Sequence, residues 1–103
     1  MPIFGHKDPT DKRGLYEKIR GPSKEEVEKA VSEHFGLKEA RYVETRDSSQ
    51  EEAVKTPCVV FLIIGKFEVG GNSCDLAYVG YTVIDETEIK LAHHSAVVIM
   101  PLS

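Results

Sequence analysis

The segment from Cys58 to Met100 places apolar side chains at both the odd and the even positions of its strand-like runs. Successive side chains of a strand point to opposite faces of a sheet. An antiparallel sheet with one solvated face would alternate apolar with polar residues, and this segment interrupts its apolar pattern only near the ends of the runs. The sequence therefore predicts a sheet that is buried on both faces.

Polar and turn-forming residues separate the predicted strands from one another. β-Branched and aromatic residues dominate the runs after residue 57. The four predicted strands are 39–46, 58–69, 74–84 and 88–100. Turn-forming residues at 70–73 and 85–88 predict hairpins between consecutive strands, and the polar residues 47–56 are expected to form an exposed loop.

One helix is clearly marked in the sequence. Ser23 with Glu26 three positions later forms a capping box, and Gly36 supplies a left-handed stop, so a helix is predicted from Lys24 to Phe35. Its apolar positions follow the spacing of a single buried stripe. The stripe consists of Val27, Ala30, Val31, His34 and Phe35.

These elements define a fold class and a domain organisation. We expect an α+β fold, in which a four-stranded antiparallel meander is packed by one or two N-terminal helices on one face. A chain of 103 residues can bury one core, so residues 1–103 are expected to form a single domain. Residues 1–22 are assigned to an N-terminal arm or a short helix, with Pro9 suited to the first turn and Gly21 to the end.

A sheet with two apolar faces needs two covers. If the hairpins fix the register, one face receives the helix and the other is left for the N-terminal arm, a second copy of the chain or a small apolar ligand. Because isologous dimers are common, we favour the arm together with a homodimer contact. The expected interface residues are Val60, Leu62, Ile64, Val79, Tyr81, His94, Val98 and Met100.

Residues that could carry acid and base chemistry are few. A pocket between helix and sheet would combine an imidazole with phenols. Its expected lining is Phe35, Tyr42, Tyr78 and His93. His93 and His94 are neighbours on a predicted strand and would point to opposite faces, so no metal site is expected from them. No cofactor fingerprint occurs, and none is expected.

The N-terminus offers a second catalytic candidate. Removal of Met1 would leave Pro2 as a secondary amine, which an apolar pocket can tune to act as a base. The start Pro2-Ile3-Phe4 resembles the tautomerase superfamily, in which an N-terminal proline opens a strand. The resemblance covers three residues; Gly5 to Pro9 interrupt any such strand, and the β-α-β repeat of that family is missing.

Cys58 and Cys74 are the only cysteines. On straight strands in the predicted register they would lie over 30 Å apart at about 3.3 Å per residue, whereas a disulfide needs Cα atoms within about 7 Å. We therefore expect two buried thiols that pack as small apolar groups.

Charge and hydropathy limit the partners. Residues 1–24 hold six basic and three acidic side chains, and the rest of the chain carries seven basic against fourteen acidic ones. The basic residues of this first quarter are interleaved with acids and are not accompanied by a set of aromatic residues for stacking, so nucleic-acid binding is not expected. No run approaches the roughly 20 apolar residues of a membrane span, and the start has no signal-peptide core, so a cytoplasmic location is expected.

Three functions are open at this point. The leading expectation is a non-enzymatic interaction or ligand-binding module that self-associates through an apolar sheet face. The first alternative is a small enzyme or carrier that uses His93 or Pro2 for acid and base chemistry. The second is a weak polyanion binder that uses the basic N-terminal arm.

Overall fold

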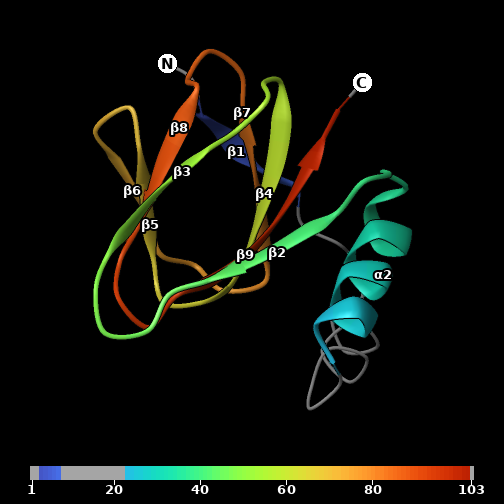
Figure 1. Cartoon of the computed structure of the whole chain (residues 1–103). Coiled ribbons are helices and arrows are strands. Elements are labelled where there is room, and N and C mark those ends of the chain that lie inside the picture. Colours follow the sequence, from blue (N-terminus) through green and yellow to red (C-terminus); the bar gives the residue numbers. More distant parts are fainter. Residues whose placement is uncertain (1–2, 8–22, 103) are drawn as a thin grey trace.

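The structure is a computed structural model that describes residues 3–7 and 23–102 (Figure 1). Its helix α2 spans Lys24–Phe35, as predicted. Ser23 accepts a hydrogen bond from Glu26 N at 3.3 Å, and Gly36 ends the helix in the left-handed conformation. The buried face of α2 consists of Val27, Ala30, Val31 and Phe35. His34 is exposed, so its place in the predicted stripe was wrong.

The strands form two antiparallel sheets. A five-stranded sheet has the order β1-β7-β4-β9-β2, and a four-stranded sheet has the order β3-β8-β5-β6. The strands are β1 Ile3–Lys7, β2 Arg41–Glu44, β3 Gln50–Ala53, β4 Cys58–Ile64, β5 Phe67–Val69, β6 Asn72–Cys74, β7 Val79–Val83, β8 Glu88–Leu91 and β9 Ala96–Pro101. The fold is therefore α+β with antiparallel sheets.

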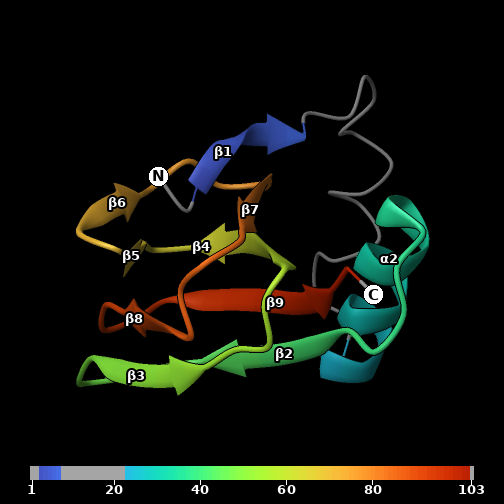
Figure 2. The same ribbon diagram turned by 90° about the horizontal axis from the view of Figure 1, so that it is seen from above.

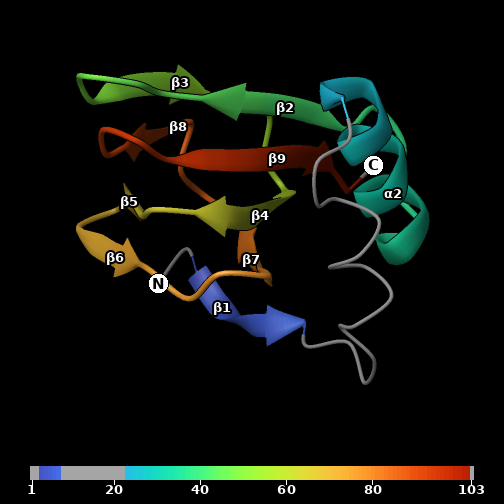
Figure 3. The same ribbon diagram turned by 90° about the horizontal axis from the view of Figure 1, so that it is seen from below.

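The predicted strands 58–69 and 88–100 are each divided into two short strands, whereas 39–46 becomes β2 and 74–84 becomes mainly β7. Figures 2 and 3 show β3 in line with β2, β8 in line with β9 and β5 in line with β4, whereas β6 runs across the direction of β7. The first member of each pair belongs to the four-stranded sheet and the second to the five-stranded sheet. The predicted single four-stranded sheet is thus folded over itself, and the two halves face each other across a core (Figure 1).

The strand order is not that of a meander. β4 lies between β7 and β9, and β5 lies between β6 and β8. The hairpin predicted at 70–73 joins neighbours β5 and β6, with its turn at Gly70 and Gly71, but residues 84–87 cross from β7 to a strand that is not its neighbour. The predicted loop 47–56 contains β3, whose side chains are mostly exposed and which pairs with β8. β3 was missed because polar residues on a solvated edge strand give no apolar pattern.

The bends are held by a set of hydrogen bonds that we call the bend network, made by Thr45, Lys66, Ala92 and Ser95. Ser95 Oγ accepts from Lys66 N at 3.1 Å, and Ser95 N donates to Thr45 Oγ1 at 2.9 Å. Ala92 N donates to Lys66 O at 3.0 Å, and Thr45 N donates to Ser95 O at 2.8 Å. Thr45 and Ser95 are buried, so these bonds satisfy polar groups that water does not reach.

Two apolar cores result from the folding. The inner core lies between the sheets and consists of Val54, Cys58, Val60, Leu62, Phe67, Val69, Cys74, Val83, Ile89, Leu91, Val97 and Ile99. The outer core lies between α2 and the five-stranded sheet and consists of Val27, Ala30, Val31, Phe35, Val59, Phe61, Val98 and Met100. The strands β4 and β9 of the five-stranded sheet are buried on both faces, one covered by α2 and the other by the four-stranded sheet.

The residues expected at a dimer interface are mostly inside one chain. Val60, Leu62, Val98 and Met100 are fully buried, and Val79 is 4% exposed. Val98 and Met100 face the helix, not the side of Val60 and Leu62, because β9 pairs Val98 with Phe61. Tyr81 is partly buried against the inner core, and only Ile64, 59% exposed, and His94 lie at the surface. No second copy is needed to cover this face.

The N-terminal segment is described only in part. Ile3–Lys7 forms β1 and pairs with β7, so the expectation that Gly5 to Lys7 would interrupt a strand was wrong. Pro2 and the proposed arm or short helix over residues 8–22 lie outside the described residues.

We predict that Gly65→Ala destabilises the protein by roughly 2 kcal/mol or more. Gly65 has a φ of 85°, and a methyl group there would come within 2.7 Å of Ser95 Cα, in the middle of the bend network. Gly71→Ala is the matched control, because Gly71 has a φ of 80° but nothing within 4 Å of the added carbon. It should cost about 1 kcal/mol. Urea unfolding of both variants measures the difference, and equal losses would contradict the role given to the bend.

Candidate functional site

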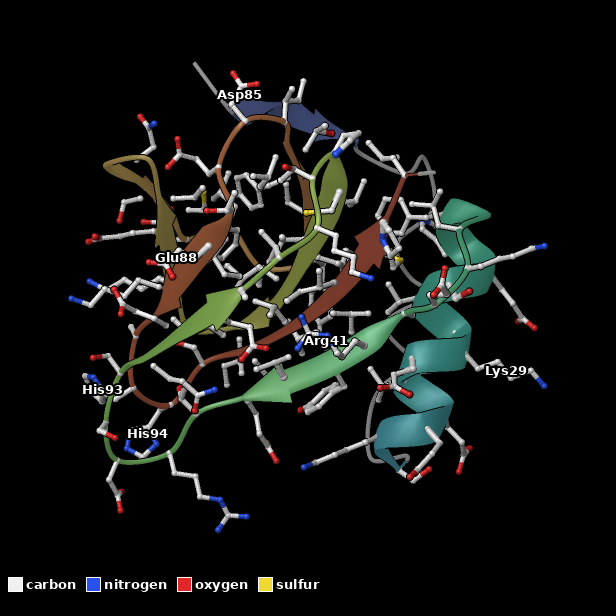
Figure 4. All side chains as sticks on the ribbon, turned by 45° about the horizontal axis from the view of Figure 1, so that its top comes forward. Lys29, Arg41, Asp85, Glu88, His93 and His94 are labelled. Atoms are coloured by element: carbon white, nitrogen blue, oxygen red, sulfur yellow. The ribbon has the colours of Figure 1, made fainter. Side chains whose placement is uncertain are left out.

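The folded sheet is open along one side, between β2 and β3. One side chain spans this opening, which we call the seam: Arg41 starts on β2 and reaches β3 (Figure 4). Its Nη1 pairs with Glu52 Oε2, and its Nη2 donates to Ala53 O at 3.0 Å. The planar guanidinium can bind two acceptors in a fixed fork, so Arg41 ties the two sheets together at the surface.

A cavity of about 430 Å³ lies at the seam. We call it the seam cavity; its apolar lining is Ala53, Val54, Ile99 and Pro101, and its charged lining is Glu39, Arg41 and Lys55. Val54 and Ile99 also belong to the inner core, so the floor of the cavity continues the apolar interior. Small-molecule sites of this size combine an apolar wall with a few polar groups. The seam cavity has this composition.

The two thiols of the inner core differ from reactive cysteines. Burial raises the pKa of both Cys58 and Cys74 to about 11, and the nearby Arg41 charge offsets only part of this effect at Cys58. Both thiols are free and buried, as predicted. They belong to the same core cluster because the sheet folds over itself, which the straight strands of the prediction did not allow.

Of the residues expected to line a pocket between helix and sheet, Phe35, Tyr42 and Tyr78 belong to or pack against the outer core, whereas His93 lies elsewhere. The Phe35 ring packs edge-on against Phe61 with centroids 5.4 Å apart, and the Phe61 ring lies 6.1 Å from that of Tyr78. Gly80 leaves the space that Phe35 fills, since an added carbon there would lie 2.8 Å from Phe35 Cζ. Aromatic rings therefore occupy the volume that the prediction assigned to a ligand.

His93 and His94 lie at the opposite end of the molecule from α2 (Figure 4). His94 has a φ of 54° in the bend between β8 and β9, and both imidazoles are exposed with centroids 5.2 Å apart. His93 lines a hollow of about 300 Å³ on the four-stranded sheet together with Ser49, Lys66, Phe67, Glu68, Lys90 and Ala92. His93 does not lie between helix and sheet, where a straight strand was expected to place it.

Tyr42 serves to hold the helix on the edge of the sheet. Tyr42 N donates to Glu28 Oε2 at 2.7 Å, and Lys24 Nζ lies 5.7 Å from the centre of the Tyr42 ring. Lys24 also pairs with Glu44 at 2.8 Å, and this contact lowers the pKa of Glu44 and raises that of Lys24. These contacts occupy backbone and side-chain groups of the edge strand β2, and so protect that edge from pairing with another chain.

Comparisons with known proteins do not identify the function of this site. The chain matches no protein-family model, no curated protein and no solved structure. Within residues 3–7 and 23–102, no three metal-binding side chains are grouped as a metal site requires. In the same part of the chain, no helix has the length and hydropathy needed to cross a bilayer. The site is therefore judged on its geometry and charge.

Sequence reasoning missed Glu39, Arg41 and Lys55. A signal for Arg41 was present: it shares the strand alternation of Val43 and Thr45, both of which face inward. When a charged residue occupies the first of several alternate strand positions that face the core, the core is open to solvent at that end of the strand. Glu39 and Lys55 lie outside the strands and gave no such signal.

We predict that Arg41→Gln lowers the free energy of unfolding by about 1 kcal/mol, the value of a partly exposed ion pair with one added hydrogen bond. Arg41→Lys keeps the charge but not the fork, and should recover only part of the loss. Hydrogen exchange should become faster in β3 and stay unchanged in β6. Lys38→Gln, at an exposed position outside the seam, is the control; a loss as large as that of Arg41→Gln would argue against a specific tie.

The raised thiol pKa values predict a loss of stability in alkali. In the unfolded chain the thiols ionise around pH 9.0, whereas the native thiols keep their protons up to about pH 11. Their contribution to stability is therefore complete below pH 9 and falls as the pH rises from about 9 to 11. A variant with both Cys58→Ala and Cys74→Ala should have a lower free energy of unfolding at every pH. Its free energy of unfolding should fall less steeply between about pH 9 and 11, as measured by urea unfolding at each pH. A decline of the same slope would refute this cause.

Proposed function

We propose that the chain is a small non-enzymatic module that binds a small molecule in the seam cavity. The observation that carries the proposal is the cavity of about 430 Å³ itself, with an apolar floor open to the inner core and charged groups at its rim. Burying apolar ligand surface on such a floor provides the driving force, at about 25 cal/mol per Å². The charged rim provides orientation.

Binding is favoured over catalysis by the character of the groups at the cavity. Arg41 is engaged with Glu52 and Ala53 O and carries a permanent charge, so it can hold an anion but does not exchange protons. Cys58 pairs with Pro101 of the cavity wall across β4 and β9, and its raised pKa keeps it protonated at neutral pH. A protonated buried thiol is a poor nucleophile.

The two alternatives gain less support. An enzyme or carrier based on His93 would need that imidazole beside Tyr42 and Tyr78, but His93 lies in a different hollow from these phenols. The Pro2 amine and the basic residues 8–22 of a polyanion binder lie outside the described residues. Self-association through an apolar sheet face is less well supported, because the chain itself buries most of the residues expected at that interface.

We predict that an uncharged branched alcohol, 4-methylpentan-1-ol, binds at the seam with a Kd on the order of 1–10 mM. Nitrogen-15 NMR spectra should show shifts confined to residues 39–41, 53–55 and 99–101. Ala53→Phe should abolish them, because Ala53 lies on the cavity wall. Ala77→Phe, which places the same ring at another exposed alanine, should leave them intact. Shifts elsewhere, or none in the unmodified chain, would exclude the seam cavity as the site.

A further inference from the structure

The charges around the seam cavity balance each other. Arg41 and Lys55 supply two positive charges, and Glu39 supplies one negative charge on the wall itself. Glu52, the partner of Arg41, supplies a second negative charge beside the wall. A rim of this kind has little net attraction for a simple anion or cation. It fits a ligand that carries both charges, provided that each finds an opposite partner.

The positive side of the rim has free donors. The guanidinium of Arg41 has five N–H groups, of which the contacts to Glu52 and Ala53 O use two. Its orientation is fixed by these contacts, so the remaining donors are held in place before a ligand arrives. Lys55 is exposed and forms no ion pair within the described part of the chain. A carboxylate at the rim can therefore bind to both side chains.

The negative side is provided by Glu39, whose backbone is unusual. Its φ is 58°, a left-handed conformation that costs a residue other than glycine roughly 1–2 kcal/mol. Tyr78 and His94, the other described residues of this kind, lie in the connections from β6 to β7 and from β8 to β9. Glu39 lies in the turn between α2 and β2, where glycine would serve as well. Its side chain is the acidic group on the cavity wall.

We propose that the seam cavity binds a zwitterion with an apolar side chain, of the α-amino acid class. This inference rests on the proposed function. The ligand carboxylate binds to Arg41 and Lys55, its ammonium group binds to Glu39, and its side chain lies on the floor formed by Val54 and Ile99. A free amino acid carries both charged groups on one carbon, whereas a peptide terminus carries only one of them, so the free molecule is the favoured source.

The test uses probes that share one branched chain and differ in charge. Leucine carries both charges, 4-methylpentanoate lacks the ammonium group, 3-methylbutylamine lacks the carboxylate, and 4-methylpentan-1-ol lacks both. We expect leucine to bind about tenfold more tightly than any of the other three, by the NMR titration already described. The dipeptide leucylglycine, whose leucine carboxylate is blocked, should bind no better than the amine.

Variants assign each charge to its partner. Glu39→Gln should weaken leucine about fivefold or more and leave 4-methylpentanoate unchanged, whereas Lys55→Gln should weaken both. Lys29→Gln is the control, because Lys29 points away from the body of the molecule on α2 (Figure 4). Glu39→Gly should leave the urea midpoint unchanged or higher while weakening leucine, which separates a role in binding from a role in folding.

The outcomes separate this inference from the proposed function. If the alcohol or 4-methylpentanoate binds at the seam as tightly as leucine, the inference that the ligand is a zwitterion is wrong, whereas the proposed function as a binding module is supported. If leucylglycine matches leucine, the source is a peptide N-terminus and the free amino acid is wrong. If no probe shifts the seam residues, both the ligand class and the module are wrong.

Discussion

The fold depends on the bend network around Ser95. A flat four-stranded sheet of this composition would expose one apolar face, and the bends remove that problem by turning half of each strand onto the other half. Three chain segments meet at the bend, because Ser95 bonds to Lys66 N through its hydroxyl and to Thr45 through its backbone. Buried polar groups that are fully paired fix one arrangement and disfavour others. The inner core is the consequence, since its two walls face each other only after bending.

The seam follows from the same folding. Strands twist, so two halves of one sheet that bend along a line diverge with distance from the bend. Arg41 and Ala53 lie toward the open ends of β2 and β3, whereas Thr45 lies at the bend that joins them. Side chains fill the inner core near the bend, and at the far end an arginine spans the gap instead. In this folded sheet the seam cavity therefore lies at the edge opposite to the bend, with Arg41 across it.

The sequence was sufficient for local elements and insufficient for the bends. The capped helix and the glycine turn at Gly70 and Gly71 follow from short-range chemistry, and the structure has both. Burial on both faces was correct for β4 and β9, but the four-stranded sheet has one exposed face, and the cover was misjudged. Gly65 looked like an ordinary residue in a strand, although its position against Ser95 makes it the point where β4 ends and β5 begins. That contact joins residues 30 positions apart, which alternation along one strand cannot reveal.

The candidate site was missed for the same reason. His93 was expected to line a pocket between helix and sheet and to act in catalysis because a straight strand was assumed. The bend between β8 and β9 leaves His93 exposed, and the ring of Phe35 fills the space beside Gly80. Glu39 and Lys55 lie outside the strands, and only the folding of β2 over β3 brings them to one cavity. All three described residues other than glycine that have a positive φ lie in connections between elements, and Glu39 is the one that lines the seam cavity. The turn that joins α2 to β2 therefore brings an acidic residue to the cavity wall, through a chain reversal that alternation along a strand does not predict.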